Sequence, residues 1–161
     1  MGLRTSGRRT SAWRAFGIVA AIVLYAISIS GSAYELTTPV TMAHHVLLRK
    51  IYAIGAFALL GFALERSNLR RVHGVLAAAI AIAVYSYAIE IGQIVIAHSN
   101  ETFAQHAFDV ASGFGGGALG AFLALLVTAR AGRARRIEAV ALVIVFAALA
   151  WGFTVTYGPL D

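Results

Sequence analysis

The residue that most strongly suggests chemistry is Glu90, an acid within a long apolar stretch of the sequence. A carboxylate inside a membrane is costly unless it is paired or protonated, and such acids often belong to functional sites. Ser86, Glu90 and Gln93 are spaced i, i+4 and i+7, which places them on one helix face. That face is expected to point into a bundle, where it either forms interhelical hydrogen bonds or contributes to a site.

Further polar residues are predicted at the same end of neighbouring helices. Asp109 is predicted in the first turn of a helix that begins at residue 108, where the helix dipole favours an anion. Arg49 and Lys50 suit the phosphate of a lipid or of a lipid-linked sugar, or they anchor their helix at the interface. The predicted ligand-binding set is His45, Arg49, Lys50, Ser86, Glu90, Gln93, His106 and Asp109, with His106 placed in a loop over residues 97–107.

Catalysis stays an open question at this stage. Glu90 and Asp109 are the candidate acid–base groups, with His45 or His106 as a partner acid. No serine lies in a nucleophile elbow, and no triad spacing is present. Cysteine is absent, which excludes thiolate chemistry.

Histidines raise the question of a metal site. His44, His45, His98 and His106, together with the acids, offer nitrogen and oxygen ligands. Their spacing matches no motif such as HExxH, and the adjacent His44 and His45 point to different faces of a helix. The sequence therefore predicts no metal site and no cofactor.

Glycines after Asp109 predict close helix packing. Gly113 and Gly117 form one GxxxG pair, and Gly116 and Gly120 form another. A phosphate-binding loop is the rival interpretation, but no GK[ST] follows. We expect this helix to pack against the helix that contains Glu90, which would bring Asp109 near that acid.

The elements that must position these residues are membrane helices. The chain has 161 residues, of which 60% are hydrophobic and 12% charged, too apolar for a water-soluble domain of this size. The net charge of +6 first suggests nucleic acid, but the basic residues form short blocks between apolar runs, which is typical of membrane proteins. We predict an all-α, polytopic bundle of about five helices. Their ranges are 15–34, 39–64, 72–97, 108–129 and 139–157, within a single transmembrane domain over 15–160 that follows a basic tail over 1–14.

Basic residues also predict the orientation. All Lys and Arg residues except Arg49 and Lys50 lie in the N-terminal tail, in residues 66–71 or in residues 130–136. Positively charged loops face the cytoplasm, so the N-terminus is predicted inside, the C-terminus outside, and the polar residues at the outer leaflet. An alternative treats the first apolar stretch as a signal peptide cleaved near residues 31–33, which would leave four helices.

Two of these segments resemble the VanZ-like family of integral membrane proteins. Glu90 and Gln93 match the family's E-x-x-Q on one helix. Asp109, Gly116 and Gly120 match its D-x-x-x-N-x-x-G-x-x-x-G on the next helix.

Other positions complete or depart from the family pattern. His45, or His44, resembles a family histidine at the start of the second helix, and Tyr52 lies near the position of its aromatic residue. The family asparagine position holds Gly113, and the family arginine before the aspartate has no counterpart.

The resemblance implies a small helical protein of the bacterial cytoplasmic membrane, in a family linked to teicoplanin resistance. Its expected partners are membrane lipids and a lipid-linked envelope precursor or glycopeptide, without nucleic acid. Three functions follow as hypotheses. The first is binding of an amphipathic anionic ligand at the outer leaflet, and the second is an enzyme that acts on such a ligand. The third is a structural partner that assembles through the Gly113–Gly120 face, and the oligomeric state is open.

Overall fold

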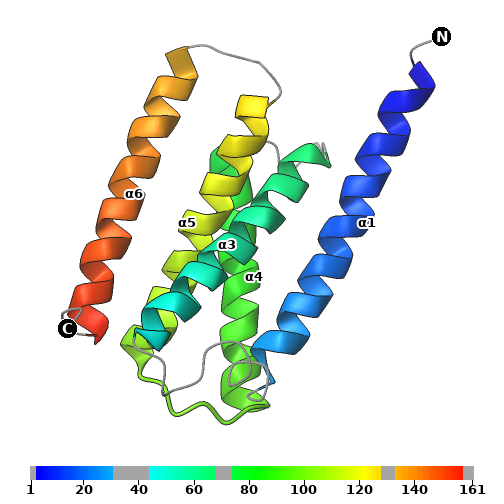
Figure 1. The fold of residues 1–161 in the computed structure, drawn as a ribbon. Helices are drawn as coiled ribbons and strands as arrows, with labels where there is room; N and C mark the ends of the chain where they lie inside the picture. Colours follow the sequence, from blue (N-terminus) through cyan, green and yellow to red (C-terminus); the bar gives the residue numbers. More distant parts are fainter. Residues whose placement is uncertain (1–2, 31–43, 68–73, 128–132, 158–161) are drawn as a thin grey trace.

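Five long helices make up the described part of the computed structural model (Figure 1). The described residues are 3–30, 44–67, 74–127 and 133–157. Side chains are described from residue 10 in the first helix and from residue 139 in the last. The helices are α1 (Leu3–Ser28), α3 (His45–Arg66), α4 (Val75–Val95), α5 (Phe103–Val127) and α6 (Arg133–Tyr157). Within these described ranges there is no strand. Each helix contains a segment long and apolar enough to cross a membrane. For the described residues, the prediction of an all-α bundle with five helices long and apolar enough to cross a membrane is therefore confirmed.

The three central helices form the core of the bundle. α5 packs along both α3 and α4, while α1 lies against α3 and α4 on one side and α6 lies against α5 on the other (Figure 1). Consecutive helices run in opposite directions. The start of α3, the end of α4, the start of α5 and the end of α6 consequently meet at one end of the bundle, which we call the polar end.

Large apolar side chains cover the outside of this bundle. Ile22 on α1, Val84 on α4, Val143 on α6 and Trp151 on α6 are all more than half exposed. Exposed apolar surface on every side is unfavourable in water, whereas lipid tails solvate it well. The exterior thus agrees with the apolar composition.

Several helix boundaries differ from the predicted ones. α1 begins at Leu3 instead of residue 15 and ends at Ser28 instead of residue 34, and residues 31–34 lie outside the described ranges. The extension at its start is reasonable because arginine is a good helix former and no proline interrupts the basic tail. α6 likewise begins at Arg133, ahead of the predicted residue 139.

The start of α3 has a conformational cause. His44 has φ 56°, in the left-handed region, so the right-handed helix cannot include it and begins at His45. The predicted start at residue 39 lies in a segment outside the described ranges. Arg49 and Lys50 therefore lie in the first two turns of α3, close to the polar end.

α5 begins five residues earlier than predicted because of a capping box. The Thr102 backbone N–H donates to Gln105 Oε1 at 2.7 Å, and the Gln105 backbone N–H donates to Thr102 Oγ1 at 3.4 Å. The helix therefore begins at Phe103. Two predictions are corrected by this finding: His106 lies in α5 and not in a loop, and Asp109 lies beyond the first turn, where the helix dipole has little effect.

The glycines of α5 serve two packing faces. A Cβ on Gly113 would lie 2.5 Å from Ser86 Cβ, and one on Gly117 would lie 2.7 Å from Ile82 Cβ. These two glycines therefore allow the close approach of α4. A Cβ on Gly116 would lie 2.7 Å from the Ile54 carbonyl oxygen, on α3. The predicted contact with the Glu90 helix is confirmed, and α3 packs equally closely.

Gly120 also faces α3, where a Cβ would collide with the Ala58 carbonyl group. All four of the glycines predicted to mediate packing are buried inside this chain. The hypothesis that the Gly113–Gly120 face assembles with a separate partner is therefore wrong in its choice of surface, because α3 and α4 already occupy that face.

Candidate functional site

An ion pair joins α3 to α5 at the polar end. Lys50 Nζ lies 2.5 Å from Asp109 Oδ1, and the two side chains are only 12% and 15% exposed. The Lys50 ammonium group also lies 5.2 Å from the centre of the Tyr157 ring, which extends the contact to α6. The buried cation is thus compensated by one carboxylate and one aromatic face.

A second acid–base pair joins α4 to α5 one helical turn away. Glu90 Oε2 lies 2.6 Å from His106 Nδ1, and both side chains are largely buried. His106 and Asp109 are three residues apart on α5, so both pairs share one face of that helix. Glu90 therefore has the partner that its position in an apolar helix requires.

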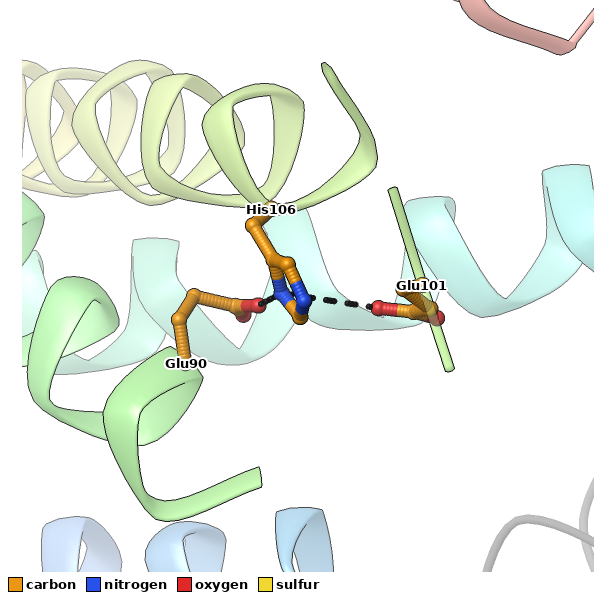
Figure 2. Close-up of side chains that lie close together, drawn as sticks. All are labelled: Glu90, Glu101 and His106. Atoms are coloured by element: carbon orange, nitrogen blue, oxygen red, sulfur yellow. Dashed lines mark hydrogen bonds and ion pairs between the residues drawn. The ribbon is translucent and has the colours of Figure 1, made fainter. Parts of the chain in front are cut away.

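A third acid approaches the same imidazole from the connection between α4 and α5. Glu101 Oε2 lies 3.8 Å from His106 Nδ1, so the ring lies between two carboxylates (Figure 2). The Glu101 backbone N–H donates to Ser99 Oγ, and the Ser99 N–H donates to the Gln93 carbonyl, which folds this connection onto the end of α4. The Glu101 side chain is 42% exposed, in contrast with the 6% of Glu90.

Ser86 completes a short ladder between α4 and α5. Its hydroxyl donates to the Asp109 main-chain oxygen at 3.1 Å, one turn along both helices from the Glu90–His106 pair. Ser86 is fully buried, and its contact with Gly113 leaves no space for a larger side chain at either position. Asp109 is thereby held through its backbone by α4 and through its carboxylate by α3.

Gln93 is turned toward a different neighbour. Its amide nitrogen donates to the Ser28 carbonyl oxygen of α1 at 3.2 Å, whereas Ser86 and Glu90 contact α5. The expectation that these three residues share one face is met only in part, because the polar stripe of α4 passes from α5 to α1 toward its end. Gln93 therefore connects α1 to the core next to the site.

The remaining predicted positions lie at the start of α3 or in the connection before α5. His45 and Arg49 are half-buried, and His44 and His98 are exposed. His44 and His98 both have positive φ, 56° and 50°. His44 directly precedes α3, and His98 lies in the connection between α4 and α5.

Three contributors were not included in the predicted ligand-binding set. Tyr157 approaches Lys50 from the last helix, Glu101 approaches His106, and Gln105 caps α5. The Thr102-x-x-Gln105 spacing is the one signal that could have indicated the true start of α5, and with it the helical position of His106. Nothing local in the sequence indicates the other two contacts.

A cavity of about 320 Å³ lies at the opposite end of the bundle from this cluster. It is bordered by α1, α3 and α4 through Trp13, Gly17, Leu60, Ile82 and other mostly apolar residues. None of the predicted ligand-binding residues borders it. The cavity offers space for an apolar group, whereas the polar chemistry lies with the two acid–base pairs.

The described cluster has definite chemical capacities. The Glu90–His106 pair can hold and transfer a proton, Lys50 can bind an anion if Asp109 releases it, and Glu90, Glu101 and His106 place their ligand atoms within 4.8 Å of one another. Comparison of the chain with protein-family models, curated proteins and solved structures finds no match. These capacities are therefore the basis for assigning a function.

Proposed function

We propose that this protein binds an amphipathic ligand with an anionic head, such as a lipid-linked phosphate, at the polar end of its membrane bundle. The main support is that ionisable groups from four helices converge there inside apolar surroundings. Helix packing alone needs only neutral hydrogen bonds, whereas buried ionic groups in membrane proteins are expensive and are typical of sites.

Aromatic side chains support a location near the lipid headgroups. Phe103 at the start of α5 is exposed, as are Tyr52 and Tyr87, which lie about two turns from the polar ends of α3 and α4. Tyrosine in particular favours the boundary between headgroups and acyl chains. The Lys50–Asp109 pair would then lie at the depth where a lipid phosphate is found, with the ligand's apolar tail in the bilayer.

The cation that meets the ligand is Lys50, supported by Arg49 and His45 on the same turns of α3. In the described structure the Lys50 ammonium group is paired with the Asp109 carboxylate. A bound phosphate must therefore replace that carboxylate as the hydrogen-bond acceptor of Lys50. Such an exchange favours a doubly charged head over a neutral one, because charge-assisted hydrogen bonds to phosphate compensate for the released carboxylate.

The family resemblance and the charge distribution suggest the cellular context. The connection between α4 and α5 contains no Lys or Arg, so the positive-inside rule assigns the polar end to the extracytoplasmic side. The resemblance of residues 86–120 to the VanZ-like family adds a bacterial cell-envelope setting, with a lipid-linked precursor or glycopeptide as the ligand.

Direct binding tests this proposal. The full chain in nanodiscs of neutral phosphatidylcholine is mixed with a long-chain prenyl monophosphate or with the matching prenyl alcohol, and binding is followed by native mass spectrometry. We expect the prenyl phosphate to bind at least about tenfold more tightly than the prenyl alcohol. The K50M/D109N variant replaces both charged side chains of the ion pair with uncharged ones of similar shape, and it should lose this preference.

Arg66→Met is the matched control because Arg66 lies at the other end of α3. The control should retain the phosphate preference, provided that circular dichroism shows all variants to be folded. Equal binding of phosphate and alcohol by the folded wild-type chain would contradict the proposal.

A second function is favoured by the 2.6 Å contact between Glu90 and His106. A carboxylate bonded to an imidazole is a common acid–base arrangement, and it would allow the chain to act on the bound head as an enzyme. Release of phosphate from a prenyl diphosphate by purified wild-type chain, abolished by Glu90→Gln, would support this function. Absence of turnover by chain that still binds the lipid would exclude it for this substrate.

A further inference from the structure

Figure 2 shows Glu90, Glu101 and His106 close together, a grouping that no local sequence motif indicates. His106 comes from α5, Glu90 from α4 and Glu101 from the connection between them, and both carboxylates point toward the same imidazole. One ligand atom from each residue lies within 4.8 Å of the other two. We propose that Glu90, Glu101 and His106 bind one first-row divalent cation, with Zn²⁺ as the best match.

The donor types select this class of ion. One imidazole nitrogen and two carboxylate oxygens suit Zn²⁺ or Mn²⁺, whereas Mg²⁺ prefers oxygen ligands and retains its water. Zinc sites that keep an open position commonly use three protein ligands, and the three residues here match that number. The proposed ion thus has room for water or for an external oxygen.

The distances lie close to those of a metal site. With metal–ligand bonds of about 2.0 to 2.2 Å, neighbouring ligand atoms of a tetrahedral site are separated by about 3.3 Å. The Glu90–His106 distance of 2.6 Å is shorter than this, and the Glu101–His106 distance of 3.8 Å is longer. Insertion of an ion requires the first pair to separate and the second to close by less than 1 Å each.

Glu101 is suited to make that adjustment. It belongs to the connection between two helices and its side chain is 42% exposed, so it can move and an ion can enter beside it. Glu90 and His106 are held in packed helices and supply the fixed part of the site. The arrangement places a rigid half-site inside the bundle and a movable ligand at its rim.

Charge balance supports a divalent ion. Lys50 is already paired with Asp109, so the two glutamates have only His106 as a nearby basic partner among the described groups that contact them. One protonated imidazole balances one carboxylate, whereas a divalent cation with neutral imidazole balances both. Metal binding therefore removes the excess negative charge, which would otherwise oppose an anionic ligand.

This last point rests on the proposed function: an ion one turn of α5 from the Lys50–Asp109 pair would offer its open position to a phosphate oxygen of the bound head. The cation itself can be tested without that ligand, which keeps the two proposals separable.

The experiment measures Zn²⁺ binding to the full chain in detergent after treatment with a chelator. Equilibrium dialysis with elemental analysis gives the stoichiometry, and Co²⁺ absorption reports the coordination. We expect one Zn²⁺ per chain, loss of binding in His106→Gln and weakening of about tenfold or more in Glu101→Gln, with no competition from millimolar Mg²⁺. His98→Asn is the matched control, because His98 is exposed at a positive φ that asparagine tolerates.

Two results would overturn the inference: no Zn²⁺ bound by folded wild-type chain, or binding that survives both His106→Gln and Glu101→Gln. A chain that binds Zn²⁺ but shows no preference for prenyl phosphate retains the cation site and loses the proposed function. A chain that binds the phosphate equally well with Zn²⁺ or with chelator, and binds no Zn²⁺, retains the function and loses the cation site.

Discussion

The Lys50–Asp109 ion pair leads to a quantitative prediction about stability. Removing one partner of a buried ion pair leaves an uncompensated charge, which typically costs 3–5 kcal/mol. Both side chains retain slight exposure, 12% and 15%, so we expect the lower part of this range, about 3 kcal/mol, for Lys50→Met or Asp109→Asn alone. That loss corresponds to roughly a hundredfold change in the unfolding equilibrium.

The double variant distinguishes a pair from two independent residues. Replacing a whole buried ion pair with uncharged groups of similar shape is often nearly neutral. We therefore expect K50M/D109N to be destabilised by only about 1 kcal/mol, far less than the sum of the single changes. The Tyr157 ring contacts the Lys50 ammonium group, so a small part of the cost remains after both charges are removed.

Reversible unfolding in mixed micelles of a mild detergent and sodium dodecyl sulfate measures these differences. The two tryptophans of the chain provide a fluorescence signal, and circular dichroism provides an independent one. Arg66→Met, at the far end of α3, should change the free energy of unfolding by less than 1 kcal/mol. The reasoning would be refuted if the double variant were as unstable as the sum of the two single variants.

Three further predictions concern helix packing and helix ends. Gly120→Ala should destabilise the bundle by about 1–3 kcal/mol in the same assay because its Cβ would collide with α3. As the control, the Cβ of Gly55→Ala meets no atom within 4 Å, so this variant should be neutral or stabilised by about 0.5–1 kcal/mol. Equal effects of the two changes would contradict the packing. Thr102→Ala should cost about 1 kcal/mol and speed amide hydrogen exchange in the first turn of α5, and unchanged exchange would argue against the cap. Gln93→Leu should loosen the contact of α1 with the core, seen as weaker crosslinking between cysteines introduced in α1 and α4, while crosslinking between α3 and α5 stays constant; loss of both would indicate a general unfolding effect.

Much of the fold could be predicted because hydropathy is a local property. A stretch of about 20 apolar residues favours a spanning helix whatever its neighbours are, so the five helices of the described ranges could be predicted. Their ends were less accurate. The capping box of Thr102 and Gln105 makes α5 begin about a turn and a half before its predicted start. The left-handed backbone of His44 sets the start of α3 at His45.

Of the candidate site, the individual residues could be predicted and their partners could not. Glu90 was identified because an acid is conspicuous in an apolar helix. Its partner His106 was assigned to a loop, and Lys50 and Asp109 were predicted without being paired. Local spacing relates residues three or four positions apart, whereas Lys50 and Asp109 are 59 positions apart and meet only when helices pack.

By itself, then, the sequence determined three features: the apolar character of the chain, the five long helices of the described ranges, and the requirement that Glu90 have a polar partner. Each of these follows from the transfer energy of nearby side chains. Only the tertiary structure decided which base meets which acid. The glycines of α5 let α3 and α4 approach on two faces at once, and that close approach brings Lys50 to Asp109 and Glu90 to His106. Pairing of this kind depends on the rotation and register of packed helices, which no single segment encodes.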